Sequence, residues 1–162
     1  MSSIRAELSG DTQELLDRLK QMGSFDKEGV LNAIAEGLRT STMERFSREQ
    51  GPEGEKWTPS IRAGSSGGKT LTQTAALKNS IRAKSDASSA AVGTNDIRAA
   101  THQFGDTRTI RAKNGKYLTF QAGGRWVRKT SVTVHIPARP FLGISREDQE
   151  EIRDILEEAM KE

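Results

Sequence analysis

The chain has 162 residues, with 25 Lys and Arg, 22 Asp and Glu, 33% hydrophobic residues and no cysteine. One domain over residues 1–162 fits this length, and the lack of cysteine excludes disulfides, thiol nucleophiles and thiolate metal sites. Two histidines are too few for a multi-histidine metal site. The apolar runs are far shorter than the ~20 residues of a membrane helix. The first residues also lack the apolar core of a signal peptide. We therefore expect a soluble protein without cofactor, metal or membrane contact.

Charge is distributed unevenly along the chain. The net charge is −2 over residues 1–50 and −5 over 141–162, but +3 over 51–100 and +7 over 101–140. Leu, Ile, Val and Phe number only 31, so that an oligomeric interface would add to a thin core. A basic middle and acidic ends fit contact with a polyanion or head-to-tail contact between copies. Two solvated acidic helices beside a basic hairpin would give the same pattern.

Two helices are predicted in the first fifty residues. The first covers about residues 11–22, where leucines recur at helical spacing after a capping-box-like start at Asp11, and Gly23 ends it. The second runs from about Asp26 to Gln50, before Gly51-Pro52. Its apolar stripe consists of Val30, Leu31, Ile34, Ala35, Leu38 and Phe46.

Residues 51–70 are rich in Gly, Pro and Ser, which predicts a long surface loop that is mobile in the free protein. Trp57 stands alone in it, either as a local packing anchor or as an anchor in an interface. The stretch GSSGGKT at 64–70 resembles a phosphate-binding loop, but it is one residue too short and follows no hydrophobic strand. These departures favour a flexible linker.

Short elements are predicted in the middle of the chain. Residues 74–77 favour one or two helical turns, and strands at about 80–85 and 90–93 follow, joined by a polar turn. Asn95 or Asp96 then caps a short helix that Gly105 ends. His102 of this helix invites a hydrolase triad, but the chain has no GxSxG elbow, and a histidine near a helix end usually packs locally or caps a carbonyl.

Residues 107–136 alternate as strands do. Residues 117–121 form one strand, Gly123-Gly124 the bend, and residues 126–127 with 132–136 the partner strand. Basic residues alternate with aromatic ones over residues 106–131, which we expect to form a mobile hairpin insertion. Such a hairpin could bind phosphates and stack on bases, or it could face a ring lumen or a neighbouring subunit.

The end of the chain predicts a linker and a helix. Pro137 and Pro140 hold Arg139 in extended backbone, which suits a permanent salt bridge, with a contact to a neighbouring subunit as the alternative. Phe141 then offers an apolar plug, and Ser145 caps the last helix. The order of elements predicts an α+β fold: an antiparallel β-sheet with long N-terminal helices and a C-terminal helix packed on it.

Four groups of residues also resemble the motifs of a known family. They are RF at 45–46 with GPEG at 51–54 and WTP at 57–59; LTQTAALKNSI at 71–81; VGTN at 92–95 with HQFG at 102–105; and IPARPFLG at 136–143, the most specific. In this order they resemble the phage virion morphogenesis family, the tail completion proteins of Mu-like and related contractile-tailed phages. Ala75 replaces the usual glycine, which disfavours a left-handed backbone there, and Arg98 replaces a common aromatic residue.

The resemblance implies a non-enzymatic virion protein at the head–tail junction of a phage or prophage, with a fold like that of ring-forming, often hexameric, tail terminators. Its implied partners are copies of itself, the tail tube and head–tail connector proteins, with DNA nearby. Its implied location is the host cytoplasm during assembly and then the virion. A basic nucleic-acid-binding module that uses residues 106–131 is the alternative. The candidate structural or interface residues are Trp57, His102, Gln103, Arg125, Trp126, Arg128, Lys129, Arg139, Pro140 and Phe141.

Overall fold

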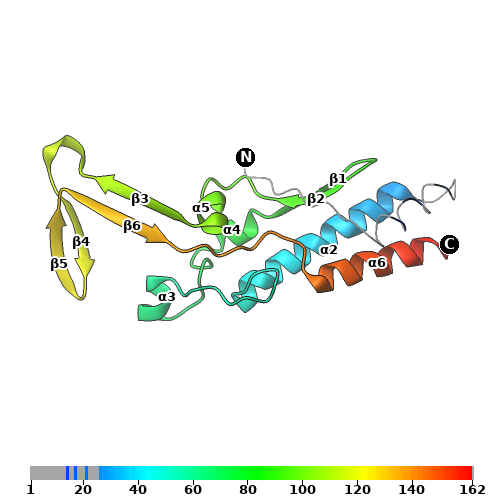
Figure 1. The fold of residues 1–162 in the computed structure, drawn as a ribbon, viewed down its shortest axis with the longest axis horizontal. Coiled ribbons are helices and arrows are strands. Elements are labelled where there is room, and N and C mark those ends of the chain that lie inside the picture. Colours follow the sequence, from blue (N-terminus) through cyan, green and yellow to red (C-terminus); the bar gives the residue numbers. More distant parts are fainter. Residues whose placement is uncertain (1–13, 15–16, 18–20, 22–25, 162) are drawn as a thin grey trace.

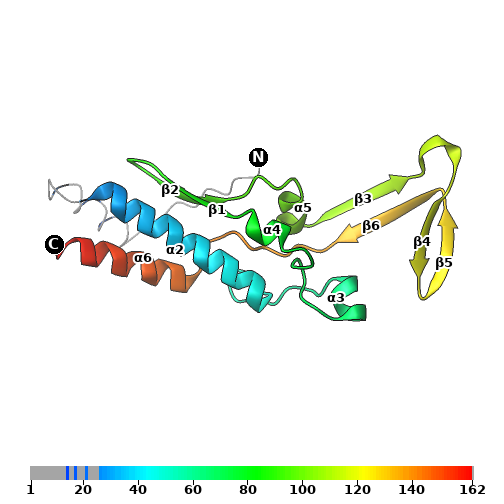
Figure 2. The same cartoon turned by 180° about the vertical axis from the view of Figure 1, so that it is seen from behind.

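The molecule is elongated, and its two ends are built differently. The computed structural model describes Glu14, Asp17, Gln21 and residues 26–161. Two long helices lie side by side at one end, short helices lie near the middle, and a narrow β-ribbon extends to the other end (Figures 1 and 2). We call residues 106–136, which form this ribbon and its tip, the arm, and the remaining described residues the body.

Helix α2 (Lys27–Arg48) is the central element of the body. The Asp26 carboxylate caps it by accepting a hydrogen bond from the Gly29 amide at 2.9 Å, and its last residues lead into a left-handed residue, Glu49. These bounds confirm the second predicted helix. The predicted helix at 11–22 lies largely outside the described residues. The three residues of this segment that the structure describes, Glu14, Asp17 and Gln21, are helical.

Helix α6 (Arg146–Ala159) packs mainly against α2, where the prediction packed it on a sheet, which corrects one detail of the predicted architecture. Its predicted start is confirmed, because Ser145 and Asp148 form a complete capping box. Ile152 and Leu156 of α6 are buried in one cluster with Ile34 and Leu38 of α2. The reason for the difference is that the apolar stripe of α2 already supplies the surface that α6 needs.

All strand pairs are antiparallel, and the described residues contain strands as well as helices, so that the predicted α+β class is confirmed. The strands form three separate two-stranded sheets in place of one sheet. The first, on the body, contacts α2, and the other two form the arm. The pairs are β1 (Arg82–Ser85) with β2 (Ala90–Gly93), β3 (Asp106–Arg111) with β6 (Ser131–Ile136), and β4 (Leu118–Ala122) with β5 (Arg125–Lys129).

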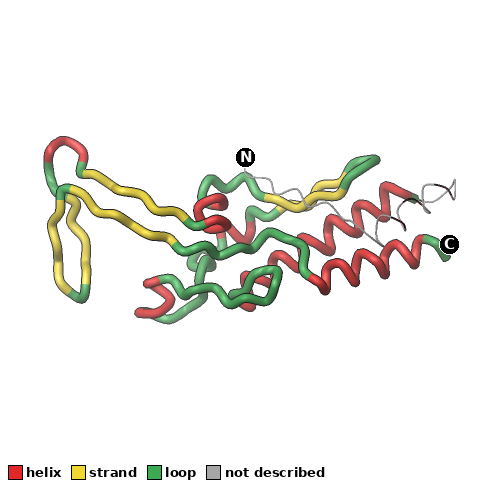
Figure 3. The backbone as a smooth tube through the Cα atoms, in the orientation of Figure 1, coloured by secondary structure: helices red, strands yellow, loops and turns green. Residues whose placement is uncertain are grey.

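Strand pairing in the arm differs from the prediction. Residues 118–122 pair with β5 alone, whereas residues 131–136 pair with β3. The cause is local: Gly123 and Gly124 both have positive φ angles, 58° and 77°, and make the tight turn whose twist suits a hairpin. Strand β4 therefore pairs with β5, the next strand in the sequence, and β6 pairs with β3, which precedes the hairpin (Figure 3).

Residues 51–70 are not one continuous loop. They contain an isolated bridge between Gln50 and Lys56 and a short helix, α3 (Ile61–Ser66), whose start is capped by Ser60. The prediction of a loop was wrong for residues 61–66. The prediction rested on the Gly and Ser content of the stretch and overlooked Ser60 as a helix cap. The other short helices are α4 (Ala76–Asn79), α5 (Ala99–Phe104) and a 3-10 turn, η1 (Lys113–Gly115).

Two short helices begin differently from the expectation. Ala75 precedes α4 in a left-handed conformation, with φ of 53° and ψ of 9°, so the expectation of a different backbone at this position was wrong, although alanine is disfavoured there. The turn is held because the Ala75 carbonyl accepts a hydrogen bond from the Asn79 amide at 2.8 Å. Helix α5 begins at Ala99 without a side-chain cap; the Asp96 carboxylate accepts from the Arg98 amide.

Candidate assembly site

The described structure has two regions of interest: a buried junction in the middle of the body, and the exposed arm. In the junction, three aromatic rings meet. The ring of Phe46 on α2 lies 5.4 Å from that of Trp57, edge to face, and 5.1 Å from that of Phe141. All three side chains are buried. They share a core cluster with Leu77, Ile81, Ala99 and Leu142.

Trp57 and Phe141 both serve the packing of this junction. The indole Nε1 of Trp57 donates a hydrogen bond to the Pro140 carbonyl at 2.9 Å, so that the buried ring has no unpaired polar atom. Phe141 is fully buried beside it. Of the two alternatives for Trp57, the structure supports the local packing anchor, because its ring lies inside this body and not on its surface.

Gln103 of α5 holds the linker before α6 by its backbone. Its side-chain oxygen accepts hydrogen bonds from the amides of Phe141 and Leu142, both at 3.0 Å, and its side-chain nitrogen donates to the Leu142 carbonyl at 3.0 Å. The amide side chain thus pairs with an extended segment much as a neighbouring strand would. The geometry assigns Gln103 a positioning role.

Arg139 forms no salt bridge with any described residue, so that prediction was wrong. Its guanidinium donates to two backbone carbonyls: Nε to Thr58 at 2.6 Å and Nη2 to Pro59 at 3.3 Å. The neighbouring chain here is the extended 57–59 segment, which presents carbonyls and no carboxylate. Burial lowers the pKa of Arg139, and its amide donates to the His102 carbonyl at 2.7 Å.

The permanent ion pair belongs to Arg45, which the sequence analysis placed outside the apolar stripe. Its side chain is 5% exposed, pairs with Asp148 of α6, and donates to the carbonyls of Phe141 at 3.0 Å and Gly143 at 2.8 Å. One signal could have found it: Leu38, Thr42 and Arg45 continue the helical spacing of the stripe. Arg45 therefore fastens the linker and α6 to α2.

His102 lies beside the junction, next to a cavity of about 330 Å³. Burial and then the charges of Arg139 and Arg98 lower the pKa of His102, so its imidazole stays neutral near neutral pH. Its Nδ1 atom is buried and has no hydrogen-bond partner among the described residues. The residues that line the cavity are Ser60, Arg62, Leu71, Gln73, Thr74, Leu77, Arg98 and His102.

The stretch that resembles a phosphate loop has its own partners within the body. The amide of Thr70 donates to the Glu49 carboxylate at 2.6 Å, and this hydrogen bond is the main cause that lowers the pKa of Glu49. The ammonium of Lys69 donates to the Ser47 carbonyl. The Thr70 amide, which a bound phosphate would need as a donor, is thus already hydrogen-bonded to the Glu49 carboxylate. This contact agrees with the interpretation of the stretch as a linker.

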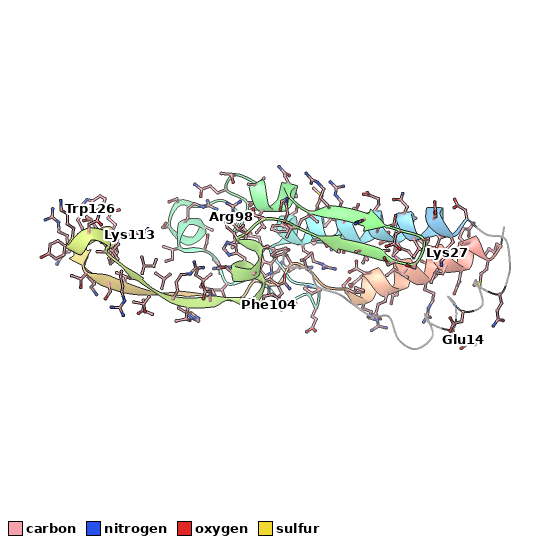
Figure 4. All side chains as sticks on the ribbon, turned by 90° about the horizontal axis from the view of Figure 1, so that it is seen from above. Glu14, Lys27, Arg98, Phe104, Lys113 and Trp126 are labelled. Atoms are coloured by element: carbon pink, nitrogen blue, oxygen red, sulfur yellow. The ribbon has the colours of Figure 1, made fainter. Side chains whose placement is uncertain are left out.

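The remaining candidate residues lie on the arm, away from the junction. Arg125, Trp126, Arg128 and Lys129 follow one another along β5 and are all exposed, Trp126 by 72%. Figure 4 shows Trp126 and Lys113 at one end of the molecule and Lys27 and Glu14 at the other. The structure thus brings Trp57, Gln103, Arg139, Pro140 and Phe141 together and leaves the basic group separate.

A model of the phage virion morphogenesis family matches residues 10–161. The chain belongs to this family. No curated protein and no solved structure matches it. The stretches that carry the resemblance supply the junction of this family member, through Arg45, Phe46, Trp57, Gln103 and Phe141. The resemblance therefore covers most residues of the junction, whereas the contact between α2 and α6 lies outside these stretches.

Over the described residues, no group of three or more His, Asp or Glu side chains could hold a metal ion. In the same part of the chain, no helix is long and apolar enough to cross a membrane.

Proposed function

We propose that this protein completes the head-proximal end of a phage tail and supports the joining of head to tail, as a non-enzymatic structural component built from several copies of the chain. It would act in the host cytoplasm during assembly and remain in the virion. The membership in a virion morphogenesis family supports the structural role. The finer role follows from the resemblance to tail completion proteins.

The observation that carries the proposal is the division of the molecule into a tied body and a projecting arm. The body is closed by buried contacts between residues about a hundred positions apart, such as Arg45 with Asp148. The arm extends from it as paired strands with few buried side chains (Figure 2). A body that keeps its shape, with an extension that reaches a neighbour, suits repeated contacts in a ring or a tail end.

The test is deletion of the gene in the phage that encodes the chain, followed by electron microscopy of lysates. We expect filled heads and separate tails in place of virions, and recovery when the wild-type chain is supplied from a plasmid. Intact, infectious virions without the protein would overturn the proposal. Full heads lacking any tail structure would also overturn it, because the defect would then precede tail completion.

A nucleic-acid-binding function is a second candidate, favoured by one observation. Two aromatic rings of the basic arm, Tyr117 and Trp126, are 63% and 72% exposed, and such rings can stack on bases beside phosphate-binding side chains. Binding of single-stranded DNA by the purified protein, with an affinity that falls steeply as salt rises, would support it. Binding that is equally weak with wild-type protein and Trp126→Ala would count against it.

A further inference from the structure

The arm has one apolar and one polar face along its β3–β6 ribbon. The register pairs Ile110 with Val132 and Arg108 with Val134, so that these side chains share a face with Ile136. On the opposite face, Thr107 and His135 are joined by a hydrogen bond of 2.8 Å, and Thr109 and Thr133 by one of 3.0 Å. These two pairs of polar side chains therefore satisfy one another across the strands.

The tip of the arm repeats this division. In the β4–β5 hairpin, Phe120 pairs with Val127 and Leu118 with Lys129, which places three apolar side chains on one face. Thr119, Gln121, Trp126 and Arg128 lie on the other face. We define the arm's apolar face as the sum of two surfaces: Ile110, Val132, Val134 and Ile136 on the ribbon, and Leu118, Phe120 and Val127 on the hairpin.

None of the seven side chains of this face is fully buried in the described structure. Ile110 is 45% exposed, and the other six are half-buried. A two-stranded ribbon in water is marginally stable at best, because it can bury neither of its faces. We therefore expect the arm to bury its apolar side chains against a partner surface.

The charges around the apolar face indicate the character of that surface. Arg125 and Lys129 project from the same face of the hairpin, and Arg108 from that of the ribbon. The one acidic side chain of the arm, Asp106, already pairs with Arg108 at 2.6 Å. A partner surface should therefore combine apolar contact with carboxylates.

The body carries such a surface between α2 and the start of α6. A groove of about 840 Å³ lies there, lined mostly by polar residues, with Pro52 and Ile144 as its apolar side chains. The exposed carboxylates of Glu53, Glu147 and Glu151 line it together with Arg48 and Arg146, which pair with Glu44 and Glu150. Beyond the groove, α6 presents further exposed carboxylates at Glu150, Asp154, Glu157 and Glu158.

We propose that the arm of one copy lies with its apolar face on the α2–α6 groove of a second copy. The arm points away from its own α6 (Figure 1), so it meets this groove on another molecule. The contact joins two different surfaces, and it therefore propagates from copy to copy and closes into a ring if the rotation allows. The inference rests on the self-assembly included in the proposed function and names the two surfaces that meet.

Cysteine cross-linking tests this contact directly, because the chain has no cysteine of its own. Gln149→Cys marks the groove, and Ala122→Cys marks the apolar side of the hairpin tip, whereas Gln121→Cys, one residue away, marks the opposite side. Mixed under mild oxidation, the Gln149→Cys and Ala122→Cys proteins should form a disulfide-linked pair in high yield. The Gln121→Cys control should give little product.

Several results would overturn the proposal. They are equal yields from Ala122→Cys and Gln121→Cys, preferential linkage of Ala122→Cys to itself, or a protein that stays monomeric at the highest attainable concentration. A charge exchange gives a second readout. R125E/K129E and E147K/E151K should each lose self-association alone and should recover it when mixed; no recovery would contradict the contact. Both experiments use purified protein, so their failure is distinct from a normal virion yield in the deletion phage.

Discussion

Arg45 of α2 and Asp148 of α6 form a buried ion pair that also completes the cap of a helix. The same Asp148 oxygen that pairs with Arg45 accepts a hydrogen bond from the Ser145 amide at 2.7 Å, inside the capping box of α6. Helix start and helix packing thus depend on one carboxylate. A substitution there removes both at once.

Asp148→Asn should therefore lower the free energy of unfolding by roughly 3–5 kcal/mol, because it leaves the Arg45 charge buried without a counter-charge. Urea unfolding followed by circular dichroism measures the loss. The matched control is Glu44→Gln, which breaks the exposed pair between Glu44 and Arg48 and should cost no more than about 1 kcal/mol. Equal effects of the two substitutions would contradict the account of the junction.

Phe141→Ala should destabilise the body by about 3–5 kcal/mol, since the ring is fully buried against Phe46. Arg139→Ala should also destabilise, because it leaves the carbonyls of Thr58 and Pro59 without their donor. Thermal unfolding of the purified variants measures both. Unfolding midpoints equal to that of the wild type would show that the linker does not hold the fold.

Ala75→Gly should stabilise the protein by about 0.5–1 kcal/mol, because glycine adopts the left-handed conformation of residue 75 without strain. The neighbouring substitution Ala76→Gly, inside α4, is the control and should have the opposite sign. Chemical unfolding of the two variants beside the wild type decides the sign. Destabilisation by both would mean that residue 75 is not left-handed in solution.

Hydrogen exchange should be fast over residues 106–131 in the free protein and should slow on assembly, because the arm buries few side chains. We expect the same change in exchange for residues 51–70, and one amide within this segment serves as a slow-exchanging reference. The Trp57 amide donates to the Glu49 carbonyl at 2.9 Å and should be protected throughout. Slow exchange along the whole arm in a monomer would contradict the prediction.

Stability should fall as the pH decreases from about 7 to about 5, because the pKa of His102 is lowered in the folded protein and the unfolded chain takes up the proton first. The contribution of His102 is complete above its unfolded pKa and is lost as the pH falls toward the folded one. His102→Gln should reduce this slope while folding normally at pH of about 7.5. An unchanged slope would exclude His102 as its source.

Local signals in the sequence were sufficient for the helices that have complete caps. Asp26 and Ser145 each accept a hydrogen bond from an amide three residues later, so spacing alone located the starts of α2 and α6. The pairing of β3 with β6 could not be read in this way. It joins residues on either side of a hairpin, and alternation along one strand does not identify its partner.

The sequence motifs identified most residues of the junction, but not the hydrogen bonds and ion pairs that these residues form. The motifs singled out Trp57, Gln103, Arg139 and Phe141, and these residues do meet. The partner of Arg139 depends on which backbone passes it in three dimensions, so spacing alone suggested a carboxylate where carbonyls stand. Arg45 belongs to the motif at 45–46, but its burial and its ion pair were missed because a charged residue beside an apolar stripe is usually assigned to the exposed face.

The separation in sequence between α2 and its buried partners determines when the body can fold during synthesis. Arg45 meets its counter-charge only once Asp148 has left the ribosome, and Phe46 meets Phe141 only shortly before. Until then the part of α2 that packs on α6, with Ile34 and Leu38, stays exposed to chaperones and proteases. A chain that ends before α6 lacks the carboxylate that pairs with Arg45, so incomplete translation products cannot form the folded body that assembly requires.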